Sequence, residues 1–365
     1  MLIGSAKIKM NIILLSFIVL RQTLFYDFMH IIYCIAQSKK VNKKGEVMKK
    51  MICVGVLIFS FMLLMPLAAL PKSVDYNEAA IEVLAPTEEN NETDLFRVLN
   101  KECGEISEMT AEEYIFGVVA AEMPALYESE ALKAQAVASY TYAYCKRMQN
   151  AKKDYDITTD FATDQSFKTR EQAIKDWGEK GEEYADKIQS AVESVIGEII
   201  IYEDKPILSV YHAVSSGQTY SAKDVWGQDY GYLKGVSSAW DKLAGNYTAV
   251  CEFTEEELKE KLKSIVDKES DKSPIIGEIK CKSSGIVESV KVCGQKLSGS
   301  EVRTALGLSS SNFSFEKKSG KYVFTSTGYG HGVGMSQYGA NCMAKQGYSY
   351  DQIIMHYYSN VKIKK

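Results

Sequence analysis

The chain has 365 residues, which is long enough for one large or two ordinary domains with an apolar core. Its 43 basic and 47 acidic side chains give a formal net charge of −4. Because no basic stripe is present to neutralise phosphates, the sequence argues against a nucleic-acid-binding protein. Tyrosine is abundant, and its ring can stack on sugars, although tyrosine is also common in ordinary cores.

The first predicted element is an apolar run over residues 12–36, interrupted by Arg21 and Asp27. A membrane protein with two spans is one interpretation of this run. We favour another, in which translation starts at Met48 and residues 1–47 are a gene-model extension. Met48 is followed by two lysines and an apolar stretch, as in an export signal. A peptide from residues 1–47 in the natural protein would contradict this hypothesis.

Residues 51–70 carry no charge over the length that spans a bilayer. We predict a transmembrane signal-anchor over 48–70, and the preceding lysines place the bulk of the chain outside the cytoplasm. A cleaved signal peptide is the alternative, but the small-residue cleavage site is poor. Residues 71–95 hold seven acidic side chains and one lysine, which predicts an extended, solvated linker.

Two helices are predicted next, after a hairpin over 96–109. Thr110 and Glu113 form a capping-box pattern that starts the first helix near Ala111. Pro124 ends this helix, so Glu122 lies on its last turn. A second helix, rich in small residues, follows and is expected to pack closely in the core.

The later elements are predicted from periodicity and turn signals. They are an irregular polar stretch over 149–182, a helix over 183–196, a hairpin of strands 198–202 and 206–212, a helix over 254–267, a hairpin over 277–292, a strand over 322–326 and a helix over 351–358. Without a regular βαβ repeat, the fold class is α+β, with mixed helices and short antiparallel strands. We expect a core made of 96–249 and 319–365, with 250–318 inserted as a smaller β-rich subdomain.

Glu122 is the candidate catalytic residue. It follows the apolar run 118–121 at the negative end of its helix, and both features disfavour an ionised carboxylate. A carboxylic acid that stays protonated near neutral pH suits general-acid catalysis on a glycosidic oxygen. An ordinary exposed glutamate at a helix end is the alternative.

Several long motifs occur in one order along the chain. The first joins V-V-A-A-E-M-P-A to E-A-L-K-A-Q-A-V-A and T-Y-A, and it resembles the opening signature of the stage II sporulation protein D family. The later motifs of that family match Y-H-A-V-S-S-G-Q-T at 211–219, V-W-G-Q-D-Y-G-Y-L-K-G-V at 225–236, E-V-R-T-A-L-G-L at 301–308, G-Y-G-H-G-V-G-M-S-Q-Y-G-A at 328–340 and H-Y-Y at 356–358. The resemblance covers roughly residues 95–362.

This resemblance implies a lytic transglycosylase acting on peptidoglycan glycan strands. Such enzymes cleave the β-1,4 bond from N-acetylmuramic acid to N-acetylglucosamine and leave a 1,6-anhydro sugar, because the muramic C6 hydroxyl replaces water. One carboxyl group, here Glu122, can protonate the leaving oxygen and then accept the hydroxyl proton. A hydrolase normally needs a second carboxylate, for which Asp224 is a candidate.

The resemblance also implies a set of substrate-binding residues. Tyr140 stands where relatives usually have arginine, so it keeps a hydrogen-bonding tip but lacks the fixed positive charge. Tyr232 and Lys234 match positions implicated in activity or glycan binding, while Lys133 is either a substrate contact or a surface lysine. The complete predicted set is Lys133, Tyr140, Tyr211, His212, Ser215, Ser216, Tyr232, Lys234, His331, Ser336 and Gln337.

Other chemistries fit the sequence less well. The segment 211–217 lacks the G-x-S-x-G form of a serine hydrolase, and the glycine-rich segment 328–339 lacks the P-loop spacing. Two histidines without a third ligand give a weak metal signal. Some family members carry a Cys/His zinc cluster after the second helix, but here the matching stretch 156–165 has neither residue. We therefore predict no metal and no cofactor, and unpaired cysteines rather than disulfides.

Family membership would also imply partners. The family needs glycan strands stripped of stem peptides, which points to an amidase, stage II sporulation protein P, and a membrane scaffold, stage II sporulation protein M, at the septal membrane during engulfment. The alternative is a non-catalytic, glycan-binding module that enhances an amidase. The intact A-A-E-M-P-A motif around Glu122 favours the enzyme, while Tyr140 favours the module. A vegetative role stays open.

Overall fold

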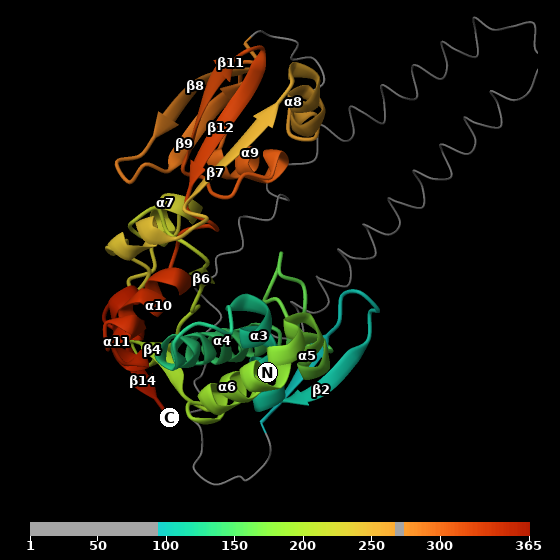
Figure 1. Ribbon diagram of the computed structural model, residues 1–365, viewed down its shortest axis with the longest axis vertical. Coiled ribbons are helices and arrows are strands. Elements are labelled where there is room, and N and C mark those ends of the chain that lie inside the picture. The colour runs from blue at the N-terminus through green and yellow to red at the C-terminus, as the bar shows by residue number, and fades with distance from the viewer. Residues whose placement is uncertain (1–93, 267–273) are drawn as a thin grey trace, which may run out of the picture. The chain divides into compact units, whose positions relative to one another are not determined.

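The computed structural model describes residues 94–266 and 274–365 (Figure 1). The predicted extension 1–47, the anchor 48–70 and all but the last two residues of the linker 71–95 lie outside these residues. Within the described ranges, no helix is both long enough and apolar enough to cross a membrane. Short strands pair mostly in antiparallel fashion between the helices, which confirms the α+β class.

The predicted hairpin and the two helices that follow it are confirmed. Strands β1 (Leu95–Leu99) and β2 (Ile106–Thr110) pair in antiparallel fashion. Helix α3 (Ala111–Glu122) starts with the predicted capping box and ends at Met123, whose backbone is extended because Pro124 follows it. Helix α4 (Ser129–Gln149) buries its alanines, so α3 packs closely against it.

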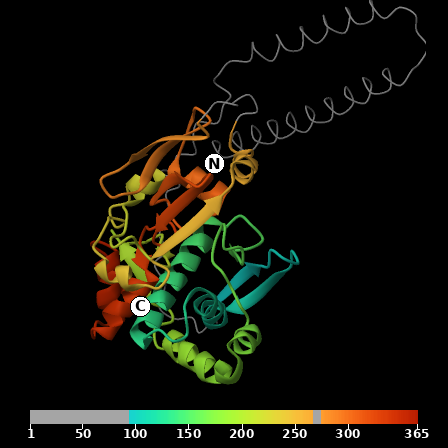
Figure 2. The same cartoon turned by 45° about the horizontal axis from the view of Figure 1, so that its top comes forward.

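A first hydrophobic cluster surrounds α4 (Figures 1 and 2). It joins α3 and α4 to elements from the middle and the C-terminal part of the chain. These are α6 (Gly181–Glu193), β4 (Ile199–Tyr202), α10 (Gln337–Lys345), α11 (Tyr350–Tyr357) and β14 (Lys362–Lys364). Strand β14 pairs with β4, so segments far apart in sequence build one core.

A second hydrophobic cluster lies within residues 253–324. Its elements are β7 (Thr248–Phe253), α8 (Glu255–Leu262), β8 (Ile276–Cys281), β9 (Val287–Val292), β10 (Gln295–Leu297), α9 (Gly299–Leu306), β11 (Phe313–Lys318) and β12 (Lys321–Thr327). The strands form two three-stranded sheets, ordered β10-β9-β8 and β11-β12-β7. Because β12 pairs with β7 across its whole length, this cluster extends past residue 318.

Two sequence predictions need correction. The stretch 149–182 is not irregular throughout, since it contains strand β3 (Ile157–Thr158) and helix α5 (Arg170–Trp177), which Thr169 caps. The predicted strand 206–212 is broken. Within this stretch, only β5 (Lys205–Pro206) pairs with β4. Pro206 has no N–H and therefore limits the hydrogen-bond ladder. Strand β6 (Tyr211–His212) pairs instead in parallel with β13 (Met335–Ser336).

The glycine-rich segment runs tightly against β6. At Gly334 the φ angle is +73°, and a Cβ atom would lie 2.0 Å from the carbonyl oxygen of Val210. At Gly330 a Cβ atom would lie 2.8 Å from Cβ of His212. Side chains at these two positions would therefore push the segment away from the strand.

Candidate active site around Glu122

Glu122 is half-buried at the end of α3. Its Oε1 atom accepts a hydrogen bond of 2.9 Å from the backbone N–H of Ser166. Among the described residues this is its one hydrogen bond, and Oε2 has no hydrogen-bond partner there. The extended backbone after Glu122 directs the chain away from the carboxylate, because the following proline disfavours another helical turn.

Gln165 forms hydrogen bonds with two tyrosines near Glu122. Its Nε2 donates to the Tyr211 hydroxyl at 2.8 Å, and its Oε1 accepts from the Tyr114 hydroxyl at 3.3 Å. Only 2% of Gln165 is exposed, so these bonds replace solvent contacts. Gln165 and Ser166 were not predicted, because an irregular loop with one glutamine and one serine carries no local signal of a site.

Tyr114 and Tyr211 lie close enough to Glu122 to feel its charge. Burial raises the pKa of both hydroxyls well above 10, and the Glu122 carboxylate raises each pKa further. Both phenols therefore stay neutral at physiological pH. Tyr211, one of the predicted substrate-binding residues, thus lies beside the candidate acid.

A chain of buried polar side chains continues from this site. Ser139 lowers the pKa of Tyr211 by hydrogen bonding and accepts a 3.0 Å bond from Gln135. Gln337 donates to the Oε1 of Gln135 at 3.3 Å. The structure therefore links two of the predicted residues, Tyr211 and Gln337, to the neighbourhood of Glu122.

The three predicted serines form hydrogen bonds with other residues. The Ser215 N–H and the Ser336 hydroxyl donate to the buried carboxylate of Asp241 at 2.9 and 3.0 Å. Burial raises the pKa of Asp241, while these hydrogen bonds lower it. Asp241 was not predicted, and it holds both serines in the interior. The hydroxyl of Ser216 bonds instead to that of Tyr220, at 2.7 Å.

His212 and His331 form a neutral pair, with ring centroids 5.7 Å apart. Val333 joins them, because its carbonyl accepts from Nδ1 of His212 and its N–H donates to Nδ1 of His331, both at 3.1 Å. Burial lowers the pKa of His212 to about 3 and that of His331 to about 4. Adjacent side chains of a strand point to opposite faces, so His212 points away from the neighbourhood of Tyr211.

Lys133 and Tyr140 interact with other side chains of this chain. Lys133 forms an ion pair of 2.8 Å with Glu130. The hydroxyl of Tyr140 donates to Asp94, which also pairs with Arg147. Tyr140 is only 7% exposed, so its contacts are those of a core residue.

The remaining predicted residues lie in or after α7 (Ala222–Trp226). The Tyr232 hydroxyl accepts the Leu208 N–H at 3.0 Å, and its ring packs 5.5 Å from that of Tyr202. Lys234 is exposed. Asp224, the candidate second carboxylate of a hydrolase, accepts from Ser221 at 2.9 Å and pairs with Lys282 at 3.4 Å.

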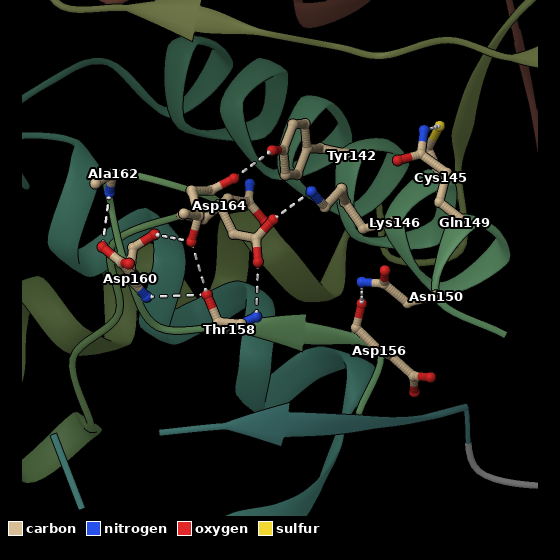
Figure 3. A network of polar contacts seen from close by, with 12 residues as sticks. Tyr142, Cys145, Lys146, Gln149, Asn150, Asp156, Thr158, Asp160, Ala162 and Asp164 are labelled. Atoms are coloured by element: carbon tan, nitrogen blue, oxygen red, sulfur yellow. Dashed lines mark hydrogen bonds and ion pairs between the residues drawn. The ribbon is translucent and has the colours of Figure 1, made fainter. Parts of the chain in front are cut away.

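The residues of loop 156–166 do not fit the zinc cluster found in some family members. Figure 3 shows the carboxylates of Asp160 and Asp164 engaged with protein groups. Asp156 pairs with Arg97 at 2.6 Å, and Asp164 pairs with Lys146 at 2.7 Å. Within the described part of the chain, no three His, Cys, Asp or Glu side chains are grouped to hold a metal. No chemical step is therefore assigned to a metal here.

Comparison with known proteins identifies the class. Residues 99–202 match the SpoIID family model, described as stage II sporulation protein. The chain is 37% identical over 264 residues to stage II sporulation protein D of Bacillus amyloliquefaciens, covering 71% of this chain and 76% of that protein. The Bacillus subtilis protein of the same name is 36% identical, with the same coverage. This chain therefore belongs to the stage II sporulation protein D family.

A more distant relative carries a different name. The amidase enhancer of Bacillus subtilis is 26% identical over 296 residues, covering 66% of this chain and 39% of that protein.

Proposed function

We propose that this protein is a peptidoglycan lytic transglycosylase of sporulation, with Glu122 as its acid and base. The observation that carries the proposal is the Glu122 carboxylate at the end of α3, whose Oε2 has no hydrogen-bond partner among the described residues. Asp224 and Asp164 are each held by a lysine and by one further hydrogen-bond donor, so neither is a free partner for a two-carboxylate hydrolase.

The geometry suits one carboxyl group that acts first as the general acid and then as the general base. Protonated Glu122 gives its proton to the glycosidic oxygen as the bond to the muramic C1 breaks. The carboxylate that remains keeps the Ser166 N–H on Oε1, a hydrogen bond that favours the charged form. It then accepts the proton of the C6 hydroxyl, whose oxygen bonds to C1 and closes the 1,6-anhydro ring.

The test is mass spectrometry of products from peptide-stripped peptidoglycan incubated with the full-length protein. We expect 1,6-anhydromuramic ends. Glu122→Gln should lower their rate of formation about 10²- to 10⁴-fold, because the amide cannot transfer the proton. Glu128→Gln, at an exposed glutamate nearby, serves as the matched control and should be neutral. Reducing ends in place of anhydro ends would mean hydrolysis and would refute the proposal.

A second candidate is a glycan-binding module that enhances an amidase. It is favoured by the similarity to the amidase enhancer and by Tyr140, whose hydroxyl is bound to Asp94. Glycan binding without any product, combined with faster turnover of an added amidase, would support this candidate instead.

We further propose that the protein is anchored in the cell membrane with its bulk outside the cytoplasm, together with stage II sporulation proteins P and M. The resemblance to the family and the uncharged run 51–70 support this arrangement. Membrane fractionation and co-purification from sporulating cells would test it, and a protein recovered only in the soluble fraction would contradict the anchor.

A further inference from the structure

Loop 156–166 supplies both contacts that define the site. Ser166 gives its N–H to Glu122, and Gln165 bonds to Tyr114 and Tyr211. Beyond the two residues of β3, this loop has no regular strand or helix to hold it. Backbone hydrogen bonds hold its start to β1, and Lys168, just beyond its end, to α3. Between these points the position of the loop depends on side-chain contacts, because loop backbone lacks the ladder that holds a sheet.

The fixed point nearest to Ser166 is Asp164, two residues before it. The Asp164 side chain is 4% exposed, and its carboxylate meets Nζ of Lys146 at 2.7 Å (Figure 3). It also accepts the N–H of Thr158 at 3.0 Å, which closes the loop on itself. Lys146 lies on the last turn of α4, so the positive partner of Asp164 comes from a helix of the core.

The other end of the loop is fixed in the same way. Asp156 accepts two hydrogen bonds from the Arg97 guanidinium and one from the Arg97 N–H. Between these ends, the carbonyl of Asp160 accepts the N–H groups of Thr163 and Asp164. The segment is thus clamped to β1 and to α4 by ion pairs.

We propose that Lys146 and Asp164 are positioning residues for Glu122. Their ion pair fixes loop 156–166, so that the Ser166 N–H stays on the carboxylate and Gln165 stays on the two tyrosines. Neither Lys146 nor Asp164 contacts Glu122, so both act through Gln165 and Ser166. This inference rests on the proposed function, in which Glu122 is the acid and base.

The test compares substitutions in the full-length protein. Asp164→Asn and Lys146→Met should lower kcat about 10- to 100-fold with little change in KM, because a small misplacement of a catalytic group costs about 10²-fold. Lys146→Arg keeps the charge and should restore most of kcat. Lys168→Met is the matched control, since Lys168 pairs with Asp176 at 2.7 Å on the surface just beyond the loop. It should leave kcat unchanged.

A second measurement separates positioning from loss of the fold. Amide hydrogen exchange followed by mass spectrometry should show faster exchange over residues 157–166 in Asp164→Asn, with the peptides of α4 and α11 unchanged. This measurement needs no turnover, so it tests the positioning even if the wild type proves inactive, which would refute only the proposed function. Unchanged loop exchange would overturn the inference. So would faster exchange with wild-type kcat, or a kcat loss that Lys146→Arg fails to restore.

Discussion

Three side chains near Glu122 are uncharged. Tyr114 and Tyr211 stay protonated, because burial raises the pKa of each, and Gln165 carries no charge. The carboxylate accepts one main-chain N–H on Oε1, and its charge acts on the two nearby phenols.

The histidines His212 and His331 predict a pH-dependent stability. The folded-state pKa values of His212 and His331, about 3 and about 4, lie below the unfolded value near 6.5. The neutral forms thus contribute stability above pH 6.5 that is lost as pH falls toward 4. Between pH 7 and pH 5 we expect His212 to lower the free energy of unfolding by about 2 kcal/mol, measured by urea denaturation.

His212→Asn is the control for this experiment, because it removes the titrating ring and keeps a polar side chain. The variant should be less stable at pH 7 and should lose less stability on acidification. An acid sensitivity equal to that of the wild type would contradict the assignment to His212.

At the level of elements, the contact between α3 and the segment after loop 156–166 depends on a glycine. A Cβ atom at Gly117 would lie 2.2 Å from the Phe167 ring and 2.7 Å from the Lys168 carbonyl. Gly117→Ala should destabilise the fold by about 1–3 kcal/mol, because an overpacked contact must shift. Thermal unfolding measures this effect, and Ala120→Gly on the same helix tests for a simple change in helix propensity.

Elements could be predicted where neighbouring residues in the sequence mark their ends. The capping box fixed the start of α3, and the proline fixed its end. The pairing of β6 with β13 was missed, because it joins residues more than 120 positions apart through a glycine-rich segment. Helix α5 was missed because its polar surface hides the apolar periodicity, although Thr169 and Gln172 form a readable cap.

At the scale of the molecule, we predict that the purified protein binds zinc at far less than one ion per chain. Of the carboxylates of loop 156–166, Asp156 is paired with Arg97 and Asp164 with Lys146, while Asp160 accepts the Ala162 N–H, which leaves no ligand set there. Elemental analysis of the protein, together with thermal unfolding with and without a chelator, measures this. Stoichiometric zinc, or a lower Tm with chelator, would show the prediction to be wrong.

The candidate site was only partly visible in the sequence. Glu122 stood out because a helix end and an apolar run are local features. Gln165, Ser166 and Asp241 did not, because their roles come from chain crossings that bring them to distant partners. Of the predicted substrate contacts, Ser215 and Ser336 are drawn inward by Asp241, which nothing in their motifs indicated.

The bond between Ser166 and Glu122 has a consequence for mutational tolerance. Its donor is the main chain, so nineteen of the twenty amino acids carry it and only proline lacks it. Position 166 can therefore vary in side chain while the carboxylate keeps its partner. Alanine scanning would score this position as neutral, although its backbone contacts the candidate acid directly.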